Sequence, residues 1–472
     1  MGSTDVNRRE LIKRSAAAGL AAVPAMGALS ACASSGSGAS DKVEKGEKTD
    51  KNPLGVNKQA GLEVVIFNGG YGDQYAQDAH KVYERSYGEV KHSKTQKIRT
   101  KMQPRMVKGN PPDVINNSGA ENMDIASLIK DGQVADLEPL LDAPTLDDPA
   151  KKVRDVLMPG TIEKGQFGGK EMYQLNYSFT VYGTWYSKTA LERLDVEYPR
   201  TWDEMLAVCA KAKREGIAGW TYAGKHPYYF SFTLYPFFTK IGGPDVMKDI
   251  DNLEPNAWKH DAVKKAFDAY YELYAKGYIL KGTPGIDHIQ SQTQWTKGNA
   301  LFIPNGSWVE NEARKTTPKD FQMTVAPPTS LDTSDAMPFE TVYAEASEPF
   351  MVPAKAKNVE GGMEWLRTML GKESTQNFTK LVSALTCVQG AAEGMELQSG
   401  LASASAVLDA AGEHVITPRI QDWYLELHKD KIGGTIAAMM SGDIKPEEAV
   451  KRCQRFADET AKDDSIKKYK HT

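Results

Sequence analysis

The sequence predicts a mixed α/β protein built from two lobes, and three observations lead to this prediction. The chain has 472 residues, which is too many for one hydrophobic core and enough for two. Short β-branched runs are followed by longer segments with helical periodicity, as in α/β folds. Several of these runs end in turns rich in glycine, asparagine and serine. Because strands of an α/β sheet point their carboxyl ends at the ligand crevice, we expect the binding site at these turns.

Composition and charge are those of an ordinary soluble globular protein. Charged residues make up 25% of the chain and hydrophobic residues 40%. The chain has 58 Lys and Arg residues against 62 Asp and Glu residues, so its net charge is −4. This near balance gives no reason to expect nucleic acid as a partner. The eight histidines lack ligand spacing and no cofactor motif occurs, so we predict neither a metal site nor a cofactor.

The first 32 residues have the features of an exported lipoprotein precursor. Residues 7–13 contain a twin-arginine pattern, and the apolar run over 15–29 is too short to cross a membrane. The run ends in Leu-Ser-Ala-Cys32, which resembles the bacterial lipobox, whose cysteine is lipidated. We therefore predict a signal peptide over 1–32 and an extracytoplasmic protein tethered by a lipid on Cys32. The alternative is an N-terminal helix with a structural cysteine.

Residues 33–60 are mostly Ser, Gly, Lys, Glu and Asp, with almost no large apolar side chain. Such a stretch buries too little surface to order itself, so it predicts a flexible tether. Three further cysteines, Cys209, Cys387 and Cys453, have no metal-binding spacing. Because three is an odd number, at least one of them must be free.

The first globular strand is predicted over 62–67, and a glycine-rich loop and a helix follow it. The loop lacks the Lys-Ser/Thr of a phosphate-binding loop, so we expect it to line a cleft through Asn68 and Tyr71. A second short strand ends at Asn117 and Ser118, whose amide and hydroxyl groups are candidate ligand contacts. An Asx turn that caps the next helix is an equally good interpretation of these two residues.

The middle of the chain predicts a long strand and then an aromatic segment. Residues 172–186 favour a strand that carries Asn176 and passes from one lobe to the other near residue 181. Five aromatic residues lie within 228–235, and Tyr228 and Tyr229 begin this segment after a proline turn. We predict that these two tyrosines are platforms at a cleft, although a small satellite core would explain the same pattern.

The segment Gly298 to Trp308 carries the strongest binding signal. Residues 300–303 predict a buried strand, and the following Pro-Asn-Gly predicts a turn that places Trp308 at the mouth of a crevice. An indole face with Asn305 and Ser307 beside it suits a sugar ring, which has an apolar face and a polar edge. A buried tryptophan after an ordinary turn is the alternative.

Ordered segments from Gly61 to the C-terminus resemble the extracellular solute-binding proteins of bacterial carbohydrate ABC importers, family 1. The matching segments are Pro112-Asp113-Val114, Trp185-Tyr186-Ser187-Lys188, Thr201-Trp202-Asp203-Glu204, Gly298 to Trp308, and Ser441 to Ala449. In that family the tryptophan of the Asn-Gly-Ser-Trp segment commonly stacks on the ligand. The resemblance implies a periplasmic-binding-protein-like fold of type II, in which a hinge connects two discontinuous lobes.

The resemblance also implies a division of the chain. After the signal peptide over 1–32 and the tether over 33–60, the first lobe comprises 61–180 and returns over 345–400, and the second lobe comprises 181–344 and 401–472 with the C-terminal helices. In the return segment, Ala346-Ser347-Glu348 replaces the usual glycine pair. This departure leaves the hinge geometry open and makes Glu348 a candidate acceptor for a ligand hydroxyl. Residues 422–425 resemble an aromatic pair that re-enters the cleft in sugar-binding relatives, which makes Trp423 a candidate ligand contact; a helix face packed on the lobe is the alternative.

The function implied by the resemblance is that of a monomeric, lipid-anchored sugar receptor, not an enzyme, that delivers its ligand to an ABC permease. The twin-arginine start, the Phe-Asn-Gly-Gly-Tyr-Gly loop and the length look similar to the actinomycete receptors for N-acetylglucosamine and chitobiose, its β-1,4 disaccharide. A receptor for another oligosaccharide is one alternative. A secreted glycoside hydrolase is another, because 62 acidic residues leave an acid/base pair open, but no local signature places one.

Overall fold

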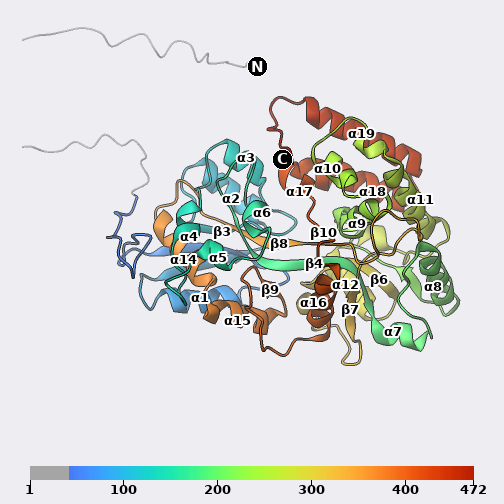
Figure 1. Cartoon of the computed structure of the whole chain (residues 1–472), viewed down its shortest axis with the longest axis horizontal. Coiled ribbons are helices and arrows are strands. Elements are labelled where there is room, and N and C mark those ends of the chain that lie inside the picture. Colours follow the sequence, from blue (N-terminus) through green and yellow to red (C-terminus); the bar gives the residue numbers. More distant parts are fainter. Residues whose placement is uncertain (1–41, 472) are drawn as a thin grey trace, which may run out of the picture. The chain divides into compact units, whose positions relative to one another are not determined.

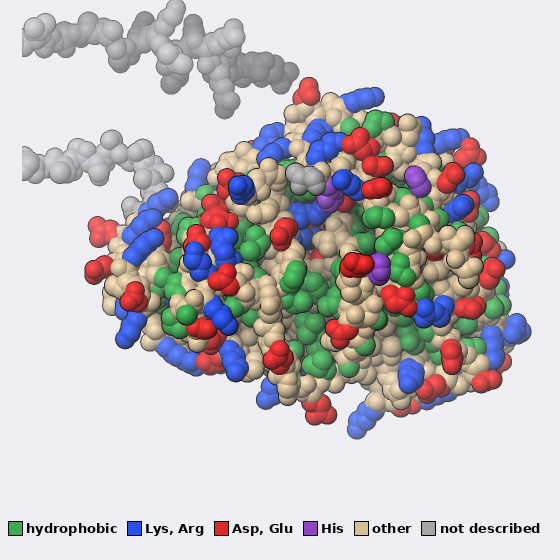
Figure 2. Space-filling view, viewed as in Figure 1, with side chains coloured by type: hydrophobic (Ala, Val, Ile, Leu, Met, Phe, Trp, Pro, Cys, Tyr) green, Lys and Arg blue, Asp and Glu red, His purple; other side chains and the backbone are tan. Residues whose placement is uncertain are grey.

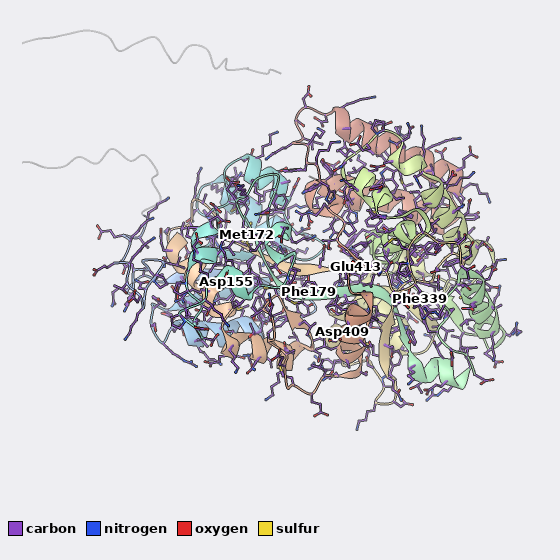
Figure 3. The ribbon with its side chains drawn as sticks, in the orientation of Figure 1. Asp155, Met172, Phe179, Phe339, Asp409 and Glu413 are labelled. Carbon is purple, nitrogen blue, oxygen red and sulfur yellow. The ribbon has the colours of Figure 1, made fainter. Side chains whose placement is uncertain are left out.

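The longest strand, β4 (Leu175–Ser187), connects two groups of helices and strands (Figure 1). The computed structural model describes residues 42–471, and all 13 residues of β4 are buried. Its first half pairs with β8 (Val342–Met351), and its second half pairs with β6 (Ala300–Gly306) and β7 (Met323–Ala326), all antiparallel. The long strand predicted from the sequence is confirmed. In Figure 3, Phe179 of β4 lies between Met172 on one side and Phe339 on the other.

The first lobe is built on parallel strands. β1 (Leu62–Phe67) pairs with β2 (Val90–Thr95) and with β3 (Val114–Asn116), and the second half of β8 adds an antiparallel strand beside β3. Its helices are α1 (Gln74–Tyr83), α2 (Ile98–Val107), α3 (Ile125–Lys130), α4 (Glu138–Asp142), α5 (Val153–Val156), α6 (Thr161–Lys164), α14 (Val359–Met369) and α15 (Lys372–Val382). β1 is covered on both faces of the sheet, which explains why its sequence is almost continuously apolar.

The second lobe is larger and mainly helical. β5 (Ala218–Trp220) pairs with β6, β10 (Val415–Ile416) pairs with the first half of β8, and β9 (Leu385–Thr386) pairs with β4 near the crossing, so one sheet of ten strands runs through both lobes. Its helices are α7 (Lys188–Arg193), α8 (Trp202–Arg214), η1 (Pro227–Phe230), α9 (Ser231–Gly242), α10 (Asp245–Asp251), η2 (Ala257–Lys259), α11 (Asp261–Ala275), η3 (Thr283–Gly285), α12 (His288–Thr296), α13 (Val309–Glu312), α16 (Ser399–Ala411), α17 (Ile420–Trp423), the π-helix η4 (Leu427–Ile432), α18 (Gly433–Met440) and α19 (Pro446–Lys462).

Residues 42–60 differ from the flexible tether predicted over 33–60. Leu54 and Val56 are buried in the core of the first lobe, and the Asn52 side chain bonds to the backbone on both sides of a tight turn. The backbone N–H of Val43 donates to Lys357 O at 3.0 Å. Two apolar side chains and one buried amide therefore hold this segment on the lobe, although its composition is polar. Residues 33–41 lie outside the described part of the chain.

All three cysteines within residues 42–471 are free and buried. Cys209 and Cys453 pack in the core of the second lobe, and Cys387 packs in that of the first. Burial raises the pKa of each thiol, so these side chains act as small hydrophobic residues and not as reactive thiolates.

Charges of both signs are interspersed over the visible face of the molecule, as expected from the balanced composition (Figure 2). Within residues 42–471, none of the helices is long and apolar enough to cross a membrane. The predicted signal peptide and the predicted lipidation site at Cys32 fall outside the described residues and stay predictions.

A buried chain of hydrogen bonds joins α14, α1 and β2. The Trp365 indole N–H donates to His80 Nδ1 at 2.9 Å, His80 Nε2 lies 2.9 Å from His92 Nδ1, and His92 Nε2 lies 2.9 Å from Asp73 Oδ2. Because His80 Nδ1 accepts a hydrogen bond, the proton of the neutral ring is on Nε2, which donates to His92 Nδ1. Burial, together with the neighbouring imidazole of His92, lowers the pKa of His80 to about 3.

The low pKa of His80 predicts that the folded protein loses stability in acid. The unfolded chain takes up the proton of His80 near pH 6.5, whereas the folded protein takes it up only near pH 3, so the free energy of unfolding must fall as the pH decreases between these values. The expected loss is on the order of a few kcal/mol. In His80→Gln the loss between pH 7 and pH 4 should be clearly smaller, as measured by urea unfolding at each pH. His414→Gln is the matched control, and an equal acid loss in wild type and His80→Gln would contradict the prediction.

Candidate functional site

A cavity of about 240 Å³ is lined by both lobes. The first lobe contributes the loops after β1 and β3, and the second lobe contributes η1, α9, α12, α17, η4 and the residues that follow β6. The crossing strands β4 and β8 complete its wall. Seven of the residues predicted from the sequence as ligand contacts line this cavity: Tyr71, Asn117, Asn176, Tyr228, Tyr229, Trp308 and Glu348.

Trp308 lies in an aromatic wall and is half-buried. Its ring meets Tyr182, Phe232 and Tyr229 edge to face, with centroid distances of 5.5, 5.7 and 6.2 Å. Tyr182 in turn stacks on Tyr343 at 4.2 Å. Trp308 also lines the cavity, and rigid aromatic planes of this kind suit the CH face of a sugar.

The position of Trp308 is set by the short helix that follows it. Glu310 of α13 accepts hydrogen bonds from the backbone N–H groups of Gly400 and Leu401, at 2.7 and 2.8 Å. N–H groups in the first turn of a helix such as α16 have no partner within the helix itself, and a carboxylate is favoured beside them. The segment that carries Trp308 is therefore anchored to a separate helix of the second lobe.

The strand before Trp308 is longer than predicted. Pro-Asn-Gly was expected to be a turn, but β6 runs through it to Gly306, and Asn305 is paired with Gly183 of β4. Cross-strand pairing overrides the local turn preference here. Asn305 and Ser307 are consequently buried outside the cavity: Asn305 Oδ1 accepts from Gly306 N at 2.9 Å, and Ser307 Oγ accepts from Val181 N at 3.4 Å.

Asn68 and Trp423 also lie outside the cavity lining. The backbone of Asn68 is held by Thr95 and Gln96, and its side chain does not reach the cavity. Trp423 lines a separate pocket and stacks on Tyr469 at 5.7 Å. Successive residues of a helix point about 100° apart, so the residues just before Trp423 on α17 face the cavity in its place.

Polar groups occupy the part of the wall made by the first lobe and by β8. Ser118 Oγ donates to Glu348 Oε2 at 2.9 Å, and burial raises the pKa of Glu348 to about 7. The amide of Asn117 closes its own loop by bonding to the backbone N and O of Met123, at 2.8 and 2.9 Å. In contrast, the buried Nδ2 of Asn176, a residue that lines the cavity, has no hydrogen-bond partner among residues 42–471. A donor left in this way is available to a ligand oxygen.

A buried ionic cluster at the same cavity was not predicted from the sequence. Lys164 of α6 donates to Glu345 of β8 and, at 2.6 Å, to Asp422 of α17. Glu345 also accepts from the Tyr343 hydroxyl at 2.8 Å and from Gln421 Nε2 at 2.8 Å. Lys164, Glu345 and the neighbouring residues Gln421 and Asp422 come from three segments whose contacts join positions 76 to 258 apart, so no local motif could indicate the cluster.

Comparisons with known proteins agree with this geometry. A family model described as bacterial extracellular solute-binding protein matches residues 70–376. The diacetylchitobiose binding protein NgcE of Streptomyces coelicolor is 34% identical over 427 residues, which cover 89% of this chain and 89% of that protein.

Solved structures support the same fold. A chitin oligosaccharide binding protein aligns with a TM-score of 0.65 at 17% identity, over 84% of this chain and 98% of that one. The GacH receptor of Streptomyces glaucescens aligns with a TM-score of 0.64 at 17% identity, over 84% of this chain and 97% of that one. These likenesses confirm the predicted two-lobe, periplasmic-binding-protein-like fold, and the family match confirms the resemblance found in the sequence.

Proposed function

This chain belongs to the family of bacterial extracellular solute-binding proteins, and we propose that it captures N-acetylglucosamine or its β-1,4 disaccharide, chitobiose, for an ABC permease. The site is extracytoplasmic, and lipid on Cys32 anchors the protein to the membrane. The finer sugar assignment is supported by the 34% identity to the diacetylchitobiose binding protein, and the anchor is supported by the lipobox sequence.

The observation that carries the proposal is the combination of ring faces and buried polar groups in one cavity. Trp308, Tyr228 and Tyr229 act as platforms for pyranose rings, and Asn176 and Glu348 bond to hydroxyl or acetamido groups. Stacking supplies affinity. The polar groups supply discrimination, because a buried donor or acceptor that a wrong ligand leaves unpaired costs about 1 to 3 kcal/mol.

The cavity joins the two lobes, so closure on the ligand is part of the mechanism. Lys429 of η4 donates to Asn122 Oδ1 in the first lobe at 2.7 Å, and Asn311 of the second lobe donates to the carbonyl of Gly70. A ligand stabilises the closed form only by its differential affinity for that form. The closed receptor then docks on the permease.

Isothermal calorimetry on the full chain tests the proposal. We expect N-acetylglucosamine or chitobiose to bind at least tenfold more tightly than maltose and cellobiose, with one site per chain. Preferential binding of maltose or cellobiose would replace the assigned sugar with another oligosaccharide. If none of the four sugars binds, the assigned sugar is wrong, and heat that continues after saturation while product accumulates would favour a hydrolase.

A further inference from the structure

The cavity is lined by more carboxylates than lysines. Two lysines, Lys164 and Lys429, line it together with four carboxylates: Glu312, Glu345, Glu348 and Asp422. Lys164 is held between two of these, Glu345 and Asp422. Lys429 instead donates to neutral oxygens, namely the carbonyls of Gly119 and Ala120 and the Asn122 side chain. In the described part of the chain, residues 42–471, neither Glu348 nor Glu312 has a lysine or arginine nitrogen within 4.0 Å.

The two histidines of the cavity do not supply the missing charge. His428 is buried, its Nδ1 lies 3.0 Å from the Tyr235 hydroxyl, and burial lowers its pKa to about 3, so the ring is neutral. His288 Nε2 lies 3.7 Å from Glu312 Oε1, beyond hydrogen-bonding distance, and burial lowers its pKa as well. Neither ring is therefore a strong cationic partner for the two carboxylates at neutral pH.

Glu348 is built into the wall at a conformational cost. It is a non-glycine residue with a φ of 58°, in the left-handed region, where L side chains are disfavoured. One oxygen accepts from Ser118 at 2.9 Å, and within residues 42–471 no lysine, arginine or histidine nitrogen lies within 4.0 Å of either oxygen. Strained residues of this kind are concentrated at ligand sites.

Glu312 follows Trp308 by one turn of helix and is equally enclosed. Its side chain is 8% exposed, and Oε2 accepts from Gln292 Nε2 at 2.7 Å. Burial raises the pKa of the Tyr71 hydroxyl and the charges of Glu348 and Glu312 add to that rise; all three side chains line the cavity. Burying charges without a partner is costly, and an incoming cation would relieve that cost.

We propose that the cavity prefers a saccharide with a free, protonated amino group, whose N–H donors bind Glu348 and Glu312. This inference rests on the proposed function and narrows it: within the N-acetylglucosamine class, the deacetylated disaccharide binds more tightly than chitobiose. An ammonium group forms charge-assisted hydrogen bonds to carboxylates, which are about twice as strong as neutral ones. The unpartnered Nδ2 of Asn176, a residue that is 1% exposed, donates to a hydroxyl or ring oxygen of the same ligand.

Calorimetry with three disaccharides tests this preference. The probes are β-1,4-diglucosamine, which carries two amino groups, chitobiose and cellobiose, each titrated at pH 7 into the full chain. We expect diglucosamine to bind at least tenfold more tightly than chitobiose. Glu348→Gln and Glu312→Gln keep the shape of the side chain and remove its charge, so each should lower this ratio at least fivefold.

Glu373→Gln is the matched control, since Glu373 lies in an exposed ion pair with Arg85 and should leave all three affinities unchanged. Chitobiose binding equal to or tighter than diglucosamine binding would overturn the inference and leave the proposed function intact. A preference for diglucosamine that survives both Gln substitutions would also overturn it, because the two carboxylates would not be its source. Failure of all three disaccharides, and of N-acetylglucosamine titrated beside them, would overturn the proposed function and this inference together.

Discussion

Trp308→Ala is expected to weaken sugar binding by about a hundredfold. Truncating a central aromatic anchor typically costs about 2 to 4 kcal/mol, which corresponds to a loss of roughly 30- to 1000-fold in affinity. The loss has two sources here: the stacking face itself, and the edge-to-face contacts with Tyr182, Phe232 and Tyr229 that hold the aromatic wall together. The measurement is calorimetric affinity for the sugar that wild type binds best.

Two further variants separate stacking from general damage. Trp308→Phe keeps a ring but reduces its area, so its affinity should fall between wild type and Trp308→Ala. Trp423→Phe changes a tryptophan that lies outside the cavity, so its affinity should match wild type within twofold. Circular dichroism spectra should be the same for all three. If Trp423→Phe weakens binding as much as Trp308→Ala, the assignment of the platform is wrong.

Lys164→Met is expected to have the largest effect on stability. The substitution leaves Glu345 and Asp422 close together without their shared cation, and removing one partner of a buried ion pair typically costs about 3 to 5 kcal/mol. Burial already raises the pKa of Glu345, and the charge of Lys164 opposes that rise. Without Lys164 the carboxyl should therefore take up a proton at higher pH, and part of the lost stability should return as the pH is lowered. Urea unfolding at pH 7 and pH 5 measures both effects.

The control for charge alone is Lys451→Met, which removes an exposed lysine paired with Glu447 one helical turn away. Exposed pairs contribute little, so its unfolding curve should overlay that of wild type. The double variant Lys164→Met with Glu345→Gln removes one of the two stranded charges and should recover part of the loss. A stability change below about 1 kcal/mol in Lys164→Met would show that the cluster is not the buried network described here.

The sequence by itself determined the elements whose formation depends on neighbours in the chain. The Thr201–Glu204 capping box begins α8, and Pro446 occupies the first turn of α19. The apolar pattern of β4 also identified the crossing strand. Such features can be predicted from the sequence because a helix cap, a fixed φ angle or a two-residue alternation acts over a few residues and needs no tertiary partner.

Tertiary structure decided which side chains face the cavity. Pairing with β4 extends β6 through the turn-like Pro-Asn-Gly and buries Asn305. On α17, Asp422 faces the cavity and the adjacent Trp423 does not. The cluster of Lys164, Glu345 and Asp422 exists only because three distant segments meet. Residue type and spacing indicated a sugar site, but side-chain direction depends on strand register and helix rotation. Both are set by long-range packing, where one residue of shift moves a side chain from cavity to core.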